Sequence, residues 1–291
     1  MKIALSVLVF FTAAAALLAQ NAGEFFAKAQ AAKNPQAKLA YYSKAIKLNP
    51  AFFEAYNGRG LAYYELKNYK KAVSDFTKAV KLNPGAPRAY FNRGKAYYRG
   101  QMFDEAIADY SKAINRDPSY ANAYFCRALA YNEIKMPGTA IADYSRAIEL
   151  SPKTWSYYNR RGVIYLETGD YKKALADFEN VAQMDPKDPI ARNNRGKAYM
   201  RLKQWEKARA DFEKAVKLEK NFPSAYINIA GYWWTGKKNA KEALKNIETA
   251  FQKGFSRCDR LYDGEEEGYF LKGLSGTRPF GLLAAKYCRG T

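Results

Sequence analysis

Arginine recurs at every thirty-fourth position across the middle of this 291-residue chain, as Arg59, Arg93, Arg127, Arg161 and Arg195. A guanidinium presents its N–H donors in a planar fork that matches phosphate and carboxylate groups, so a line of arginines could bind a polyanion. The alternative is a set of structural ion pairs, because an aspartate follows each arginine at a fixed distance. These aspartates are Asp75, Asp109, Asp143, Asp177 and Asp211.

Arginine and aspartate occur together or not at all at these two positions of the period. Phe25 and Tyr41 occupy them near the N-terminus, and Ile229 and Lys245 occupy them near the C-terminus. This joint presence favours ion pairs between two helices, because a buried charge that loses its partner costs about 3 to 5 kcal/mol. We therefore predict that the five arginines stabilise the fold rather than bind a ligand.

The rest of the sequence lacks the residue patterns of common catalytic sites. The chain has no histidine, which removes the commonest general base and a common metal ligand. It has no CxxC pair, no glycine-rich phosphate loop after a strand and no serine nucleophile elbow. The acidic run from Asp263 to Glu267 lacks the spaced geometry that a calcium site needs. The sequence predicts neither an enzyme nor a metal or cofactor site.

Other residue types recur with the same period and define the elements that must position the charged side chains. Prolines end successive units at Pro50, Pro84, Pro118, Pro152 and Pro186. Within a unit, a large, a small and a tyrosine residue follow one another at spacings of four and three, which is the spacing of one helix face. After a short polar or glycine-containing turn, a second stripe of alanine, aromatic and alanine predicts a second helix.

The unit from residue 87 to 120 shows this pattern most clearly, with Tyr90, Gly94, Tyr97, Ala106, Tyr110 and Pro118. The pattern resembles the tetratricopeptide repeat (TPR), a family of paired antiparallel helices. The resemblance implies an all-α fold: an α-solenoid wound as a right-handed superhelix, with about seven units and a C-terminal cap. It also implies binding of extended peptides or helices along the inner face.

Small residues and caps give two further expectations. The small position holds Gly60, Gly94, Ala128, Gly162 and Gly196. A mid-helix glycine costs about 1 kcal/mol relative to alanine, so its recurrence predicts that the two helices of a unit touch there. Asp188 before Pro189, and Thr154 before Trp155, predict helix starts with a side-chain cap.

The repeats divide the chain into a series of segments. Residues 1–19 are expected to be a signal peptide, 20–52 a degenerate first unit, 53–222 five regular units, 223–256 an altered seventh unit and 257–291 a capping segment. The seventh unit needs a one-residue shift to align Ala243, Ile247 and Ala250 with the other units. We expect one continuous solenoid with a distributed core.

The segment from Ile3 to Ala19 carries no charge and is rich in alanine towards its end. These features are typical of a secretory signal peptide cleaved near Ala19. Leu17 occupies a position where a small residue is preferred, so an uncleaved membrane anchor is the alternative. Both interpretations predict export, and the mature chain is expected to be periplasmic or secreted, with the anchored form as the alternative.

The charge and the cysteines extend this picture. Lysine and arginine outnumber acids by 48 to 28, a net charge of +20 that favours acidic partners. The lysines could instead form a solvated face that keeps the protein soluble. Nucleic acid is not expected as a partner, because export removes the chain from most of it. Cys258 and Cys288 could pair in an oxidising compartment, which the sequence leaves open, and Cys126 is expected to be a small apolar filler.

A second stripe on the first helix of each unit faces away from the packed stripe and predicts a groove. The predicted groove residues are Arg88, Phe91, Asn92, Lys95, Arg99, Phe125, Arg160, Asn194, Lys197, Arg201 and Asn228. We expect the cations to meet acidic side chains, the asparagines to hold a peptide backbone, and the phenylalanines to anchor apolar groups. Glu54, Glu65, Glu133 and Glu167 interrupt the positive lining.

The sequence therefore predicts a non-catalytic scaffold that binds a protein or peptide of acidic character in an envelope or secreted assembly. The alternative is an electrostatic binder of an anionic polymer or membrane surface through the basic faces of the protein.

Overall fold

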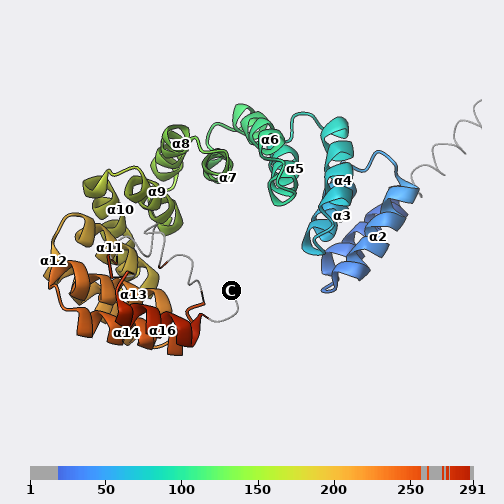
Figure 1. Ribbon diagram of the computed structural model, residues 1–291. Coiled ribbons are helices and arrows are strands. Elements are labelled where there is room, and N and C mark those ends of the chain that lie inside the picture. Colours follow the sequence, from blue (N-terminus) through green and yellow to red (C-terminus); the bar gives the residue numbers. More distant parts are fainter. Residues whose placement is uncertain (1–18, 257–260, 262–270, 272, 275, 289–291) are drawn as a thin grey trace, which may run out of the picture. The chain divides into compact units, whose positions relative to one another are not determined.

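The computed structural model describes residues 19–256, 261, 271, 273–274 and 276–288 (Figure 1). Helices joined by short turns make up this part of the chain, and no described residue lies in a strand. Three sequence predictions fall on residues outside it. These are the signal or anchor segment apart from Ala19, the acidic run from Asp263 to Glu267, and the pairing of Cys258 with Cys288.

The chain divides into two compact units, Met1–Ser151 and Pro152–Thr291, each of which contains several of the 34-residue repeats. The first contains a helix over residues 19–31, then α2 (Pro35–Leu48), α3 (Phe53–Glu65), α4 (Tyr69–Leu82), α5 (Pro87–Arg99), α6 (Phe103–Arg116), α7 (Ala121–Glu133) and α8 (Pro137–Leu150). The second contains α9 (Trp155–Glu167), α10 (Tyr171–Met184), α11 (Pro189–Arg201), α12 (Trp205–Leu218), α13 (Pro223–Gly231), η1 (Tyr232–Gly236), α14 (Ala240–Gln252) and α16 (Arg278–Tyr287).

Within each unit the helices stack as antiparallel pairs, which confirms the predicted all-α solenoid class. Each helix packs mainly against its neighbours in the chain, as α5 does against α4 and α6. In the first unit, Figure 1 shows α5 and α7 on one side and α6 and α8 on the other. Within Met1–Ser151 and within Pro152–Thr291, successive pairs stack on one another.

Alanines and aromatic rings fill the space between paired helices. Ala106 and Ala113 of α6 are fully buried, and Tyr110 lies between them on the same face. This ring contacts α5 at Gly94, where an added Cβ would lie 2.9 Å from the tyrosine. At Gly60 the same atom would lie 2.7 Å from Phe76. The prediction that paired helices touch at the small residue is confirmed.

The turn between α3 and α4 contains a left-handed residue, and so do the turns inside the five pairs that follow, as a helix end of this type requires. Lysine or glutamine occupies it at Lys67, Gln101, Lys135, Lys203 and Lys238, all with positive φ, and glycine occupies it at Gly169. At helix starts, the Asp188 side chain accepts a hydrogen bond from the Ile190 amide at 2.8 Å, as predicted. Thr154 precedes α9 but makes no side-chain cap, so that prediction was wrong.

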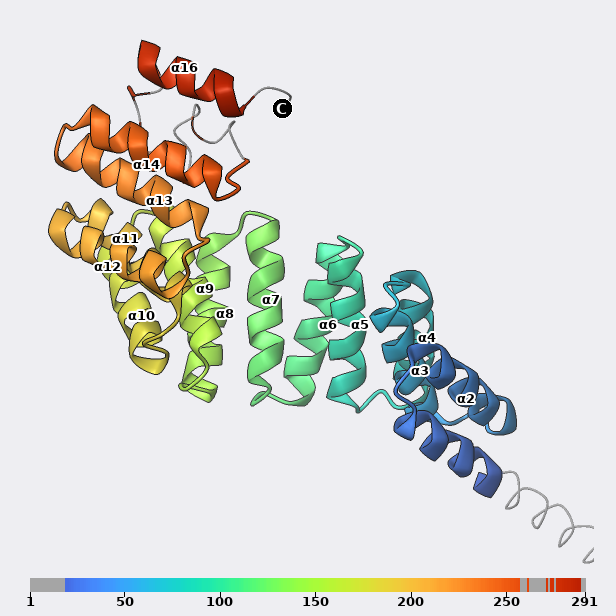
Figure 2. The same ribbon diagram turned by 90° about the horizontal axis from the view of Figure 1, so that it is seen from below.

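The last helix pair differs because α13 continues into the π-helical η1 (Tyr232–Gly236). A π turn accommodates one residue more than an α turn, which matches the one-residue shift seen in the sequence. Figure 2 shows α16 against α14. Phe280 of α16 is buried in the core that holds Ile247 of α14, and Lys286 forms an ion pair with Glu248 at 2.9 Å. The described part of the closing segment therefore covers the last helix pair.

No helix in the described ranges is both long and apolar enough to cross a membrane.

Replacing Gly60 by alanine should destabilise the first unit by about 1 to 3 kcal/mol, because the new methyl group overlaps the Phe76 ring. Gly138 in α8 is the matched control, since nothing lies within 4 Å of an added Cβ there. Gly138→Ala should stabilise by up to about 1 kcal/mol. Urea unfolding followed by circular dichroism measures both, and equal effects of the same sign would contradict the contact.

Candidate partner-binding surface

Each of the five recurrent arginines forms a bidentate ion pair with the aspartate of its paired helix. Nε and Nη2 of Arg93 donate to Oδ2 and Oδ1 of Asp109 at 2.6 and 2.8 Å. The same geometry joins Arg59 to Asp75, Arg127 to Asp143, Arg161 to Asp177, and Arg195 to Asp211. Asp109 is only 2% exposed. The predicted structural role of the arginines is confirmed.

The same guanidiniums also reach the preceding helix pair. Nη1 donates to a hydroxyl there, from Arg59 to Ser43, from Arg93 to Thr77 and from Arg127 to Ser111. The rings of Tyr90 and Tyr97 flank Arg93 at 5.8 and 5.9 Å. The hydrogen bonds to Asp109 raise the pKa of Arg93 against the opposing effect of burial, so the pair stays ionised. These donors are committed to the fold and are not presented to a phosphate.

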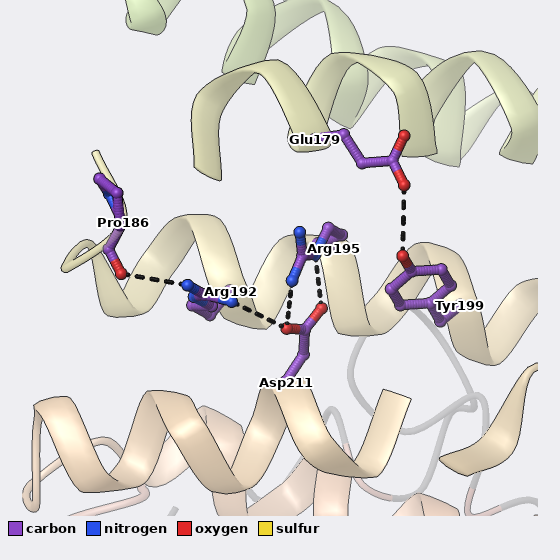
Figure 3. A network of polar contacts seen from close by, with 6 residues as sticks. All are labelled: Glu179, Pro186, Arg192, Arg195, Tyr199 and Asp211. Atoms are coloured by element: carbon purple, nitrogen blue, oxygen red, sulfur yellow. Dashed lines mark hydrogen bonds and ion pairs between the residues drawn. The ribbon is translucent and has the colours of Figure 1, made fainter. Parts of the chain in front are cut away.

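In the sixth repeat, residues 189–222, a second arginine joins the ion pair (Figure 3). Arg192 stands where five other repeats have tyrosine, and its Nη1 lies 3.5 Å from Oδ1 of Asp211. Its Nη2 donates to the Pro186 carbonyl at 3.3 Å, whereas its buried Nε has no hydrogen-bond partner among the described residues. Figure 3 also shows the Tyr199 hydroxyl donating to Glu179 at 3.2 Å. One buried carboxylate thus serves two guanidiniums.

Replacing Arg93 by alanine should destabilise the first unit by about 3 to 5 kcal/mol, because Asp109 would remain buried and unpaired. The double variant Arg93→Met with Asp109→Leu should lie within about 1 kcal/mol of the parent, since it removes both charges. The midpoint of urea unfolding measures both variants. A single variant as stable as the parent would contradict a structural role for the pair.

A group of cations and aromatic rings lies on the predicted groove face of α3 and α5. We call Tyr64, Phe91, Lys95 and Arg99 the Tyr64 cluster. Lys95 Nζ lies 5.0 Å from the centre of the Tyr64 ring and 5.8 Å from that of Phe91. Arg99 Nε donates to the Tyr64 hydroxyl at 3.2 Å, and this bond raises the pKa of Arg99. Within the described ranges, no carboxylate forms an ion pair with Lys95 or Arg99.

The first unit also contains the predicted groove residues Arg88 on α5 and Phe125 on α7. Arg88 is exposed at the start of α5, and the half-buried Phe91 packs against Tyr120 with ring centres 4.8 Å apart. Phe125 of α7 packs against Tyr144 at 5.6 Å and is also half-buried. The free thiol of Cys126 has its pKa raised to about 11 by burial, so it stays protonated at neutral pH.

The asparagines of the predicted groove form hydrogen bonds with asparagines of the preceding repeat. Nδ2 of Asn92 donates to Asn57 at 3.0 Å, Nδ2 of Asn194 to Asn159 at 3.0 Å, and Nδ2 of Asn228 to Asn193 at 2.8 Å. Asn228 is only 2% exposed, so the prediction that it holds a peptide backbone was wrong. Asn92 and Asn194 remain half-buried and keep one accessible side.

A signal for these pairs was present in the sequence. The first asparagine of each pair occupies the fifth position of a 34-residue repeat, and the second occupies the sixth position of the next repeat. Where the fifth position is Phe91 or Phe125, the following sixth position is Cys126 or Arg160. The joint presence that identified the arginine–aspartate pairs therefore also identifies the asparagine pairs.

The predicted groove residues of the second unit lie on α9, α11 and α13. Arg160 is exposed on α9, and Lys197 is half-buried on α11. The Arg201 guanidinium lies over the Tyr171 ring at 5.7 Å, because Leu166 replaces the tyrosine that Arg99 meets in the first unit. The Tyr64 cluster is thus the best-defined group of predicted groove residues and is our candidate site.

Comparisons with known families match much of the repeated region. Residues 39–67 and 60–101 match a family model described as TPR repeat. Residues 137–189 and 159–226 match one described as tetratricopeptide repeat, and residues 87–120 match another of that description. Together the matched residues make up more than half of the chain. No curated protein matches the sequence.

Solved structures of TPR proteins share the fold. The C-terminal part of a TPR repeat-containing protein from Cytophaga hutchinsonii has a TM-score of 0.66 at 19% identity, covering 81% of this chain and 99% of that chain. A TPR protein from Parabacteroides merdae has a TM-score of 0.62 at 18% identity, covering 82% and 95%. YrrB, described as a TPR protein with an unusual peptide-binding site, has a TM-score of 0.54 at 23% identity, covering 62% and 92%.

Proposed function

Because the chain belongs to the tetratricopeptide repeat family, whose fold is typical of protein-interaction scaffolds, we propose that it is a non-catalytic scaffold for an acidic peptide segment. The segment, from a protein or peptide partner, binds at the Tyr64 cluster of the first unit. The observation that carries this proposal is the pair of cations, Lys95 and Arg99, held on aromatic groups without a carboxylate partner in the described part of the chain.

The cluster supports recognition of a carboxylate in three ways. The Tyr64 and Phe91 rings attract the Lys95 ammonium and hold it in place without neutralising its charge. A carboxylate that reaches Lys95 or Arg99 gains a charge-assisted hydrogen bond, which is about twice as strong as a neutral one. Because the cations are already ordered on the rings, less side-chain entropy is lost on binding.

Neighbouring groups supply the other contacts that a peptide needs. The half-buried Phe91, whose ring centre lies 5.8 Å from Lys95 Nζ, offers apolar surface beside the cations, and Phe125 offers more on α7. Asn92 uses its amide nitrogen to bond Asn57, which fixes the orientation of the side chain and leaves its Oδ1 to accept a hydrogen bond from a backbone N–H. The unusual peptide-binding site described for YrrB is consistent with this use of the fold.

The setting of this interaction is an exported one in our proposal. It rests on the uncharged segment from Ile3 to Ala19, whose composition is typical of a signal peptide and whose length also suits a membrane anchor. The partner would then be a protein of the envelope or of a secreted assembly.

Charge reversal at the cluster tests the proposal. Dodecamer peptides selected from a random display library on the full chain should be enriched in Asp and Glu. Lys95→Glu with Arg99→Glu should weaken their binding at least about 30-fold, because loss of a charged hydrogen bond typically costs about 2 kcal/mol or more. Fluorescence anisotropy with the selected peptides gives the dissociation constants.

The matched control changes the same charge on the opposite helix layer. Lys78 and Lys81 are exposed on α4, and Lys78→Glu with Lys81→Glu should change the affinity less than about threefold. Equal losses in both variants, with a steep loss on adding salt, would contradict the site and favour a diffuse electrostatic binder. Selected peptides without acidic residues would also contradict it.

A further inference from the structure

Positive charge is unevenly distributed over the outer helices of the first unit. We define the lysine face as the exposed side chains of Lys44 and Lys47 on α2 and of Lys70, Lys71, Lys78 and Lys81 on α4. Helix α2 contains no acidic residue. The acid of α4 is Asp75, which is buried and bonded to Arg59. No carboxylate in the described ranges forms an ion pair with any lysine of the face.

Helices α2 and α4 are joined by α3, which packs against both of them. The six ammonium groups therefore belong to one compact unit and to neighbouring second helices of its stack. The next second helix, α6, carries Asp104 and Glu105 at the positions that Lys70 and Lys71 occupy in α4, although it keeps Lys112 at the position of Lys78. Lysines without an acid on the same exposed face are therefore concentrated on α2 and α4.

The lysines of α4 oppose the stability of their own helix. Lys70 and Lys71 lie in its first turn, where the helix dipole favours acids such as Asp104 and Glu105 of α6. Lys78 and Lys81 are three residues apart, and like charges at this spacing repel each other. Lys71 gains one contact within the fold, because its Nζ lies 5.5 Å from the centre of the Tyr63 ring. The helix dipole and the repulsion between Lys78 and Lys81 still oppose the arrangement, and a negatively charged partner would relieve this repulsion.

We propose that the lysine face binds the anionic surface of a phospholipid bilayer. The face contains six lysines and no arginine, and a compact ammonium suits diffuse attraction to lipid head groups, whereas the arginine fork suits fixed bidentate contacts. The segment from Ile3 to Ala19, whose composition is typical of a signal peptide or membrane anchor, also favours a membrane setting for the chain.

Vesicle binding of the full chain tests the proposal. Vesicles of phosphatidylglycerol and phosphatidylcholine in equal parts should bind the protein more tightly than vesicles of phosphatidylcholine alone. The difference between them isolates the charge effect from any contribution of the apolar N-terminal segment. Lys78→Glu with Lys81→Glu should lower the partition coefficient at least about 25-fold, since each lysine near an anionic surface contributes about fivefold.

The second unit provides a control at the same positions of a different helix. Lys214 and Lys217 on α12 are exposed and stand where Lys78 and Lys81 stand on α4. Lys214→Glu with Lys217→Glu makes the same change in net charge and should lower the partition coefficient less than about threefold. Equal losses in the two variants would overturn the lysine face in favour of overall net charge.

A stability measurement separates loss of binding from loss of folding. Lys70→Asp with Lys71→Glu gives α4 the acids that α6 carries, so its melting temperature should equal or exceed that of the parent, while vesicle binding falls. Wild-type protein that binds both vesicle types equally would overturn the proposal. So would tighter binding to heparin than to the anionic vesicles at the same salt concentration, which would indicate a polymer ligand.

Discussion

The bidentate arginine–aspartate pair is the interaction on which the stacking of this protein depends. Each guanidinium joins the two helices of its own repeat through two short hydrogen bonds. Arg59, Arg93 and Arg127 also reach a hydroxyl of the preceding helix pair. Such a group constrains both the pairing of helices and the register between pairs, because its planar fork accepts one geometry. The flanking tyrosines bury the charge, and removal of either partner would leave the other uncompensated. The groove face of the first helices is oriented by this constraint.

That orientation explains why similar residues have different roles on one helix. In α5, Arg93 points to Asp109 and is consumed by the fold, whereas Arg99, less than two turns later, bonds the Tyr64 hydroxyl and stays exposed. Asparagine shows the same division within a single side chain, because the amide nitrogen of Asn92 bonds Asn57 while its carbonyl oxygen accepts no hydrogen bond in the described part of the chain. The predicted groove is thus partly built from polar contacts between neighbouring repeats, and these contacts fix the orientation of side chains on the groove face.

The sequence predicted those parts of the structure that depend on contacts that recur from one 34-residue repeat to the next. Arginine with aspartate, and glycine with an aromatic ring, recur at fixed spacing and are therefore visible without a structure. The asparagine pairs were overlooked because they join the fifth position of one repeat to the sixth position of the next, and only three of them occur in the described ranges. The π turn at Tyr232–Gly236 appeared only as a misaligned residue, since its hydrogen-bond pattern has no residue signature.

The net charge of +20 describes this protein poorly, because the structure separates the charges into groups with different consequences. The five arginine–aspartate pairs contribute no net charge and stabilise the stack. Six lysines of α2 and α4 form no ion pair in the described part of the chain, whereas α6 carries Asp104 and Glu105 at the positions of Lys70 and Lys71. A uniform requirement for solubility would not distinguish neighbouring helices of one stack in this way. Since first helices carry the Tyr64 cluster and second helices carry the lysine face, the peptide and the bilayer that we propose as partners would bind to different helix layers of the first unit.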